Sequence, residues 1–284
     1  MQNSLNLLPI DSHYEIRAVQ SDDKTTKNRV IEYLRPHETE ALFLLPNLKN
    51  PHLPSHYYIA EAGEKIMGVA AHFPPFKSFS LFSEDQAISK KFVHILAKRH
   101  TIKSFYGMPP CGKAAFEEFL NLGFRAAKGP RGIFMEASCA DVHFVAPREG
   151  TIRLAGKKDT DAIVRLQRSL YKRSPLEPIG EEERDRVRFT PVTFCLEIDN
   201  QIVCSASSNG LGHKVFQILF VATHPEYQKR GFAKAICSHL IRHFQEKGGE
   251  KAALFTDYDN IFAQACYHAL GFQHTCEYYF TKFV

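Results

Sequence analysis

An internal repeat constrains the fold of this 284-residue chain more than any other feature of the sequence. An Ile-Arg dipeptide ends at Arg17 and again at Arg153, 136 positions later. Glu61 and Glu197 have the same separation of 136 positions, and each lies in a segment that reads as a strand, a polar turn and a second strand. Short matches can also arise by chance, but the shared offset favours two copies of one α/β unit.

Each half also closes with a predicted helix followed by Leu-Gly-Phe, at residues 122–124 and 270–272. Residues 138–150, "SCADVHFVAPREG", carry the turn residues expected at a junction. We therefore predict one domain over residues 1–140 and a second over residues 150–284.

The second half alternates between strand and helix patterns. Residues 214–225, "KVFQILFVATHP", read as one buried central strand, and residues 231–247 have apolar positions at helical spacing. Residues 251–259 read as a strand, 260–272 as a helix and 275–284 as a final strand. This order predicts an α/β sheet with mostly parallel pairing at its centre.

Composition excludes several classes of protein. Hydrophobic residues make up 44% and charged residues 24%, and no uninterrupted apolar run approaches the length of a membrane span. The N-terminal segment lacks a basic leader, so we expect a cytoplasmic protein. The seven cysteines form no metal-ligand pattern and predict reduced, buried thiols and no metal site. The net charge of +5 is scattered, which disfavours nucleic acid as a partner and suits an anionic cofactor.

The stretch "HPEYQKRGFAKA" lies where a predicted strand passes into a predicted helix. A helix N-terminus offers free backbone N–H groups and the positive end of the helix dipole. Gly231 and Ala233 would let an anion come close to the backbone, and Lys229 and Arg230 add positive charge. A phosphate cradle and a solvated turn are both compatible with these residues.

The segment "VATHPEYQKRGFAKAI" resembles the acetyl-CoA motif of the GNAT superfamily of N-acetyltransferases, whose pattern Q/R-x-x-G-x-G/A is met by Gln228, Gly231 and Ala233. The later "FTDYDNIFAQACYHALGF" is similar to the family's strand, asparagine, helix, tyrosine and Gly-Phe ending. The resemblance covers about residues 151–284. It implies an α/β fold of two tandem GNAT-like domains, each a mixed central sheet flanked by helices.

The resemblance implies a cofactor site for acetyl-CoA. Val221 and Thr223 fall on the family's splayed fourth strand, whose backbone pairs with the pantetheine arm, and an N–H near Phe220 or Val221 would polarise the thioester carbonyl. The diphosphate would be held by the backbone and cations of one segment, made of Gln228, Lys229, Arg230, Gly231, Phe232, Ala233 and Lys234.

Two further positions match the family's pattern. Asn260 corresponds to a cofactor-contacting asparagine, although it would equally serve as the N-cap of the next helix. Tyr267 corresponds to the general acid, and its alternative is a packed core aromatic. The base is not identified. Gln217 lies near a position where some members of the family carry glutamate, but its amide cannot take a proton. Asp257 and Glu197 are candidates, and a surface carboxylate is the plainer interpretation of each.

The first half departs from the motif. Residues 76–92, "FKSFSLFSEDQAISKKF", contain no glycine and place Glu84 and Asp85 where a diphosphate would need positive charge. We therefore expect a degenerate N-terminal copy that shapes the substrate cleft or a homodimer surface. The predicted function is transfer of an acetyl group from acetyl-CoA to a primary amine of a small molecule or peptide. A non-catalytic acetyl-CoA-binding regulator is the alternative.

Overall fold

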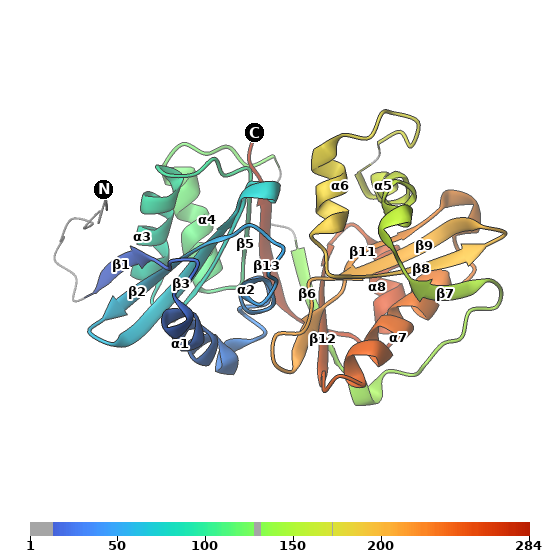
Figure 1. The fold of residues 1–284 in the computed structure, drawn as a ribbon, viewed down its shortest axis with the longest axis horizontal. Coiled ribbons are helices and arrows are strands. Elements are labelled where there is room, and N and C mark those ends of the chain that lie inside the picture. Colours follow the sequence, from blue (N-terminus) through green and yellow to red (C-terminus); the bar gives the residue numbers. More distant parts are fainter. Residues whose placement is uncertain (1–13, 128–131, 172) are drawn as a thin grey trace. The chain divides into compact units, whose positions relative to one another are not determined.

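The computed structural model describes residues 14–127, 132–171 and 173–284, so most of the N-terminal segment considered above for a leader lies outside it (Figure 1). The chain divides into two compact α/β units. The first comprises Met1–Arg131 and Glu277–Val284, and the second comprises Gly132–Cys276. Among the described residues, no helix has the length and apolar character that crossing a membrane would require.

The first unit has one mixed sheet with its strands in the order β1-β2-β3-β4-β5-β13. β4 and β5 are parallel and the other neighbours are antiparallel. The strands are β1 (Glu15–Ala18), β2 (His56–Ala62), β3 (Lys65–Phe73), β4 (Ser78–Ser83), β5 (Ser104–Gly107) and β13 (Gln273–Lys282). The helices are α1 (Lys24–Leu34), α2 (Leu45–Leu48), α3 (Gln86–Ala97) and α4 (Cys111–Asn121). α3 and α4 pack on the sheet through a phenylalanine-rich core.

The second unit contains two groups of strands. β12 (Lys251–Asp257) pairs antiparallel with β6 (Gly132–Ser138) and parallel with β10 (Val215–Gln217). The other group is antiparallel throughout, in the order β11-β9-β8-β7. Its strands are β7 (Thr151–Leu154), β8 (Val192–Ile198), β9 (Gln201–Ser208) and β11 (Leu219–Thr223). The helices are α5 (Thr160–Gln167), α6 (Glu181–Arg188), α7 (Phe232–Gln245) and α8 (Ile261–His268).

Helices α5 and α7 lie on opposite sides of the antiparallel group in the second unit (Figure 1). The apolar residues of α7, which include Phe232, Ile236 and Leu240, are buried against it in one core cluster. Short 3-10 helices complete the two units, at Arg35–His37, Pro74–Phe76, Cys139–Asp141, Lys157–Asp159, Arg168–Tyr171 and Pro225–Tyr227.

The segment expected to form one central strand, residues 214–225, forms two strands in two different groups. The N–H of Ile218 still donates to the oxygen of Ala253 in β12, at 2.8 Å. Phe220 then has a φ of 49°, and the pairing register with β9 shifts between Leu219 and Ala222. This bulge bends the chain away from β12, so β11 diverges from β10.

The repeat is visible in corresponding ion pairs. Arg17 in β1 pairs with Glu61 in β2, and Arg153 in β7 donates through Nε to Glu197 in β8 at 2.9 Å. Arg153 also donates to Asp159 at 2.7 Å, and this bond lowers the pKa of the Asp159 carboxyl to about 2. Both units therefore tie their first two strands together in the same way.

The two Leu-Gly-Phe tripeptides end α4 and α8 with the same geometry. Phe124 N–H donates to the oxygen of Phe119, and Phe272 N–H donates to the oxygen of Tyr267, each at 3.0 Å. The glycine of each tripeptide has a positive φ, 87° in the first and 96° in the second. Phe119 thus occupies the position in the first unit that Tyr267 has in the second.

The two units do not have the same bounds as the sequence ranges 1–140 and 150–284, because β6 and part of β13 belong to the opposite unit. β6 follows the first unit in the chain but pairs with β12 of the second, and Tyr279 in β13 pairs with Gly107 of the first. An apolar alternating pattern predicts that a segment is a strand but does not specify its partner. The fold class, two tandem α/β units with mixed sheets flanked by helices, is as predicted.

Candidate active site

A cavity of about 820 Å³ lies in the second unit, within the range of roughly 300–1,000 Å³ that small-molecule sites occupy. Its wall contains all but one of the cofactor and catalytic residues expected from the sequence. These are Val221, Thr223, Gln228, Lys229, Arg230, Gly231, Phe232, Ala233, Lys234, Asn260 and Tyr267. Phe220 is not part of the wall and lies at the bulge between Leu219 and Ala222.

One wall is the open edge of β11. Ala222 of this strand pairs with Ser205 of β9, and directly after the strand His224 N–H donates to the oxygen of Val203 in β9. Since consecutive residues of a strand point their backbone groups to opposite sides, those of Val221 and Thr223 point away from β9. The oxygen of Thr223 accepts a hydrogen bond from Gln228 Nε2 at 3.3 Å on that side. β11 thus presents backbone groups to the cavity, as an added strand would need.

A second wall is the N-terminus of α7. Gly231, with a φ of 84°, is at the N-cap position of this helix but has no side chain that could accept a hydrogen bond. The N–H groups of the first turn are therefore left without a side-chain acceptor at the cavity. A Cβ built on Gly231 would meet no protein atom within 4 Å. Lys229, with a φ of 64°, and Lys234 add positive charge beside these N–H groups. The arrangement suits a bound anion.

Arg230 is already engaged. Its guanidinium pairs with the carboxylate of Glu149 at 3.1 Å, and both side chains are 48% exposed. The same guanidinium lies over the ring of Tyr227, 4.9 Å from the centroid. An exposed pair of this kind contributes only about 0–1 kcal/mol, so an incoming anion could compete with Glu149 for Arg230.

Tyr267 is a packed core aromatic, and its role as general acid stays a prediction. It is 7% exposed, packs 5.9 Å from the ring of Phe272 and is part of the core cluster, and it also lines the cavity. Burial raises the pKa of its phenol well above the ordinary value of 10. The side chain therefore stays protonated at neutral pH, as a proton donor must.

The thiols around Tyr267 are uncharged. Burial raises the pKa of Cys266, which lines the cavity, to about 11, and that of Cys204 to about 12. Cys237 is fully buried, and its pKa is also raised well above the ordinary value. None of these thiols is activated as a nucleophile.

Asn260 caps a helix and lines the cavity. Its Oδ1 accepts a hydrogen bond from Ala263 N–H at 3.2 Å, which makes it the N-cap of α8, and its side chain lines the cavity. The N-cap interpretation is therefore confirmed, while a contact with a cofactor stays a prediction.

Neither candidate base lies in the cavity wall. Glu197 is held by Arg153 in β7, and the backbone oxygen of Asp257, at the exposed end of β12, accepts from Asn260 N–H. Gln217 is 1% exposed in β10 and does not line the cavity either. Among the described residues, no carboxylate lines this cavity. The structure therefore gives no support to Glu197 or Asp257 as the base.

The cavity has a wall that the sequence analysis missed. Residues 145–148, assigned above to the junction, line it together with Ser169 and Leu170. The arginine in "APREG" was a signal for this wall, because Arg148 is a cation close in sequence to an expected anion site.

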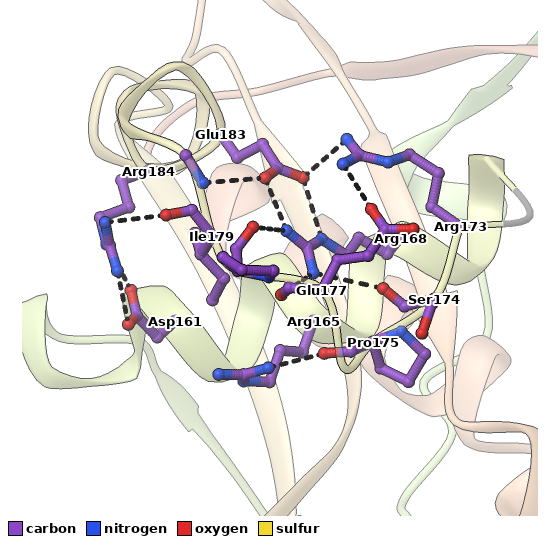
Figure 2. Close-up of polar contacts among 12 residues, drawn as sticks. Asp161, Arg165, Arg168, Arg173, Ser174, Pro175, Glu177, Ile179, Glu183 and Arg184 are labelled. Atoms are coloured by element: carbon purple, nitrogen blue, oxygen red, sulfur yellow. Dashed lines mark hydrogen bonds and ion pairs between the residues drawn. The ribbon is translucent and has the colours of Figure 1, made fainter.

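The loop between Ser169 and α6 is held by a buried arginine. Arg168 is 2% exposed, and its guanidinium makes five hydrogen bonds (Figure 2). Two go to the carboxylate of Glu183 at 3.0 and 2.7 Å, and three go to backbone oxygens of the loop, those of Ser174, Glu177 and Pro178. These bonds use the full donor capacity of arginine and fix the backbone that continues from the cavity wall.

The first unit lacks both the uncapped helix N-terminus and the tyrosine hydroxyl at the corresponding positions. The helix that follows β4 is capped by Asp85, and Phe119 has no hydroxyl where Tyr267 has one. The described residues of the first unit do outline another cavity, but it lies beside α1 and β3.

Comparisons with known proteins agree with this architecture. Residues 161–272 match the sequence profile of the acetyltransferase (GNAT) family. A protein from Drosophila melanogaster has a similar structure, with a TM-score of 0.67 and 13% identity over 94% of this chain and 98% of the other. A tandem GNAT protein from the clavulanic acid biosynthesis pathway aligns with a TM-score of 0.58 and 14% identity over 94% and 97%. A GCN5-related N-acetyltransferase from Sphaerobacter thermophilus gives 0.54 and 12% over 96% and 96%.

The fold and the cavity therefore define a tandem α/β protein whose second unit has a cavity at a helix N-terminus. Residues 161–272 match the GNAT acetyltransferase family, and the chain as a whole has the fold of a tandem GNAT protein. The matched residues include every cofactor and catalytic position expected from the sequence, from Phe220 to Tyr267.

Proposed function

We propose that this protein is an acetyl-CoA-dependent N-acetyltransferase that acts on a primary amine of a small molecule or peptide. The observation that carries the proposal is the convergence of three features on one cavity. These are the open edge of β11, the uncapped N-terminus of α7 and the buried side chain of Tyr267.

The residues of the second unit fit acetyl-CoA. Backbone groups of Val221 and Thr223 would pair with the amides of the pantetheine arm, in the manner of an added strand. The N–H groups at the start of α7, with Lys229 and Lys234, would hold the diphosphate. Bound acetyl-CoA supplies an acyl thioester, which a neutral amine can attack.

Tyr267 would donate its phenolic proton to the departing thiolate. Burial raises the pKa of this phenol, so it keeps its proton at neutral pH. A backbone N–H at the bulge near Phe220 or Val221 would stabilise the oxyanion. Because no carboxylate lines the cavity among the described residues, the amine would lose its proton to water or arrive unprotonated.

Release of free CoA tests the proposal. The intact chain is offered acetyl-CoA with a panel of small amines, polyamines and peptides, and the thiol released is measured with a thiol-reactive dye. Turnover with at least one amine, together with the mass of the acetylated product, supports an enzyme.

The missing carboxylate favours one second candidate, a non-catalytic acetyl-CoA-binding regulator. Such a protein would bind acetyl-CoA in calorimetric titration and release no thiol with any amine of the panel. Binding without turnover would select this candidate, and absence of binding would contradict both.

A further inference from the structure

The segment before β7 lies along α7 and is fastened to it. Val145 N–H donates to the hydroxyl of Ser238 at 3.0 Å, and this hydroxyl lies 3.2 Å from the oxygen of Val145, to which it can donate. The Cζ atom of Arg242 lies over the ring of Phe144, 3.4 Å from the ring centroid. The ring centroids of Phe144 and His239 are 4.5 Å apart. Residues 144 and 145 are thus fixed to the second turn of the helix and beyond.

The segment then runs toward the N-terminus of α7. Four residues further on, Glu149 pairs with Arg230, which precedes the helix. Four extended residues span roughly 13 Å, and the eight positions from Ser238 back to Arg230 span roughly 12 Å at the helical rise. The two lengths agree, so residues 145–148 lie beside the first turns of α7, where they line the cavity.

Arg148 is the cation that this segment brings to the cavity. Its side chain is exposed, and among the described residues no ion pair joins it to a carboxylate, whereas Arg230 is paired with Glu149. It approaches from a different element than Lys229 and Lys234, which flank the helix N-terminus. The cavity therefore has cations from two segments of the chain for an anionic ligand.

CoA carries two separate anionic groups, the diphosphate and the phosphate on the 3′ oxygen of its ribose. The helix N-terminus suits the diphosphate. We propose that Arg148 binds the 3′-phosphate and makes the site selective for CoA over its 3′-dephospho form. A guanidinium can donate two parallel hydrogen bonds to phosphate oxygens, which a lysine cannot do. The inference rests on the proposed function, and it adds a residue outside the matched positions 161–272.

The test is calorimetric titration of the intact chain with CoA and with 3′-dephospho-CoA. Wild type should bind CoA roughly three- to tenfold more tightly, as expected for a partly exposed ion pair. Arg148→Gln should lose this preference by binding CoA more weakly, while its affinity for 3′-dephospho-CoA stays within about twofold. Arg148→Lys, which keeps the charge without the two-pronged geometry, should keep part of the preference.

Lys158→Gln is the control for net charge, because Lys158 is exposed and does not line the cavity. It should leave the preference unchanged. Equal affinity of wild type for the two nucleotides, or an Arg148→Gln variant that weakens both equally, overturns the role of Arg148 and leaves the proposed function standing. If wild type binds neither nucleotide, the inference and the proposed function fall together.

Discussion

The carboxylate of Asp85 accepts a hydrogen bond from the backbone N–H of Ala87 at 2.7 Å, so helix α3 begins with an anion of its own. Helix α7 begins instead at Gly231, which offers no side-chain cap. An N–H group that one helix presents to a cavity is therefore occupied by a carboxylate in the other. We infer that only the second unit binds the cofactor.

The stoichiometry of binding checks this inference. Titration of the intact chain with acetyl-CoA should reach one equivalent per chain, because Asp85 and the neighbouring Glu84 repel a diphosphate from α3. Calorimetry at saturating ligand measures this number. Two equivalent sites per chain would show that the first unit keeps a cofactor site.

Substitution of Gly231 tests the cradle. Valine at a φ of 84° should lower the free energy of unfolding by roughly 1–2 kcal/mol, because a β-branched residue is strained there. It should also weaken acetyl-CoA binding at least tenfold, since its side chain would occupy open space in the cavity. Asparagine tolerates this conformation better and serves as the comparison. A stable Gly231→Asn variant with weakened binding would assign the loss to ligand contact, whereas unchanged affinity in both variants would place the cofactor elsewhere.

Replacing Tyr267 by phenylalanine removes the hydroxyl and keeps the ring on Phe272. The melting temperature and acetyl-CoA affinity should change little, while kcat should fall by roughly 10²–10⁴-fold, as is typical for the loss of a general acid. Tyr279→Phe, in the first unit, is the control and should keep full kcat. If Tyr267→Phe retains more than half of wild-type kcat, the hydroxyl is not the proton donor.

The pH profile of that variant gives a separate prediction. Since burial raises the pKa of Tyr267 well above 10, its phenol stays protonated throughout the range in which the enzyme can be assayed. The basic limb of the kcat profile should therefore have the same position in wild type and in Tyr267→Phe. A basic limb that disappears in the variant would mean that the tyrosine ionises within this range.

Glu183 should contribute stability that depends on pH. Its hydrogen bonds from Arg168 lower the pKa of the carboxyl from 4.5 to about 2 in the folded protein. A carboxyl with a depressed folded pKa stabilises the protein above its unfolded pKa, and this contribution is lost as the pH falls from about 4.5 toward 2. Denaturant unfolding across this range should show the loss, and Glu183→Gln should abolish that part of it.

At neutral pH, Glu183→Gln should lower the free energy of unfolding more than Glu177→Gln does, because the guanidinium of Arg168, which is 2% exposed, loses its counter-charge. Glu177→Gln is the matched control, since Glu177 pairs with Arg173 at an exposed position and should contribute less than about 1 kcal/mol. Equal effects of the two substitutions would contradict a special role for the buried pair.

Local patterns predicted much of this molecule. The offset between Arg17 and Arg153 indicated the repeat, and both arginines form the corresponding ion pair. The glycine between cations located the start of α7, where Gly231 does take a positive φ. Such features depend on neighbours in the chain, so the sequence is enough to find them.

Features set by distant partners escaped prediction. Ile218 and Leu219 are adjacent apolar residues. No sequence pattern shows that Ile218 hydrogen-bonds to β12 while Leu219 pairs with β9. The contact of Val145 with Ser238 joins residues 93 positions apart and brings Arg148 to the cavity. Tyr267 was assigned two alternatives, and the structure shows both a packed ring and a cavity-lining side chain.

The pairing of the last strand of the chain with β5 has a consequence for synthesis on the ribosome. Gly107 of β5 is made 172 residues before its partner Tyr279 in β13. At about 5–20 residues per second, the edge of β5 waits roughly ten to thirty seconds for that partner. The half that is translated first is therefore completed after the other, and during that interval its sheet exposes an edge to which a chaperone or another nascent chain could bind.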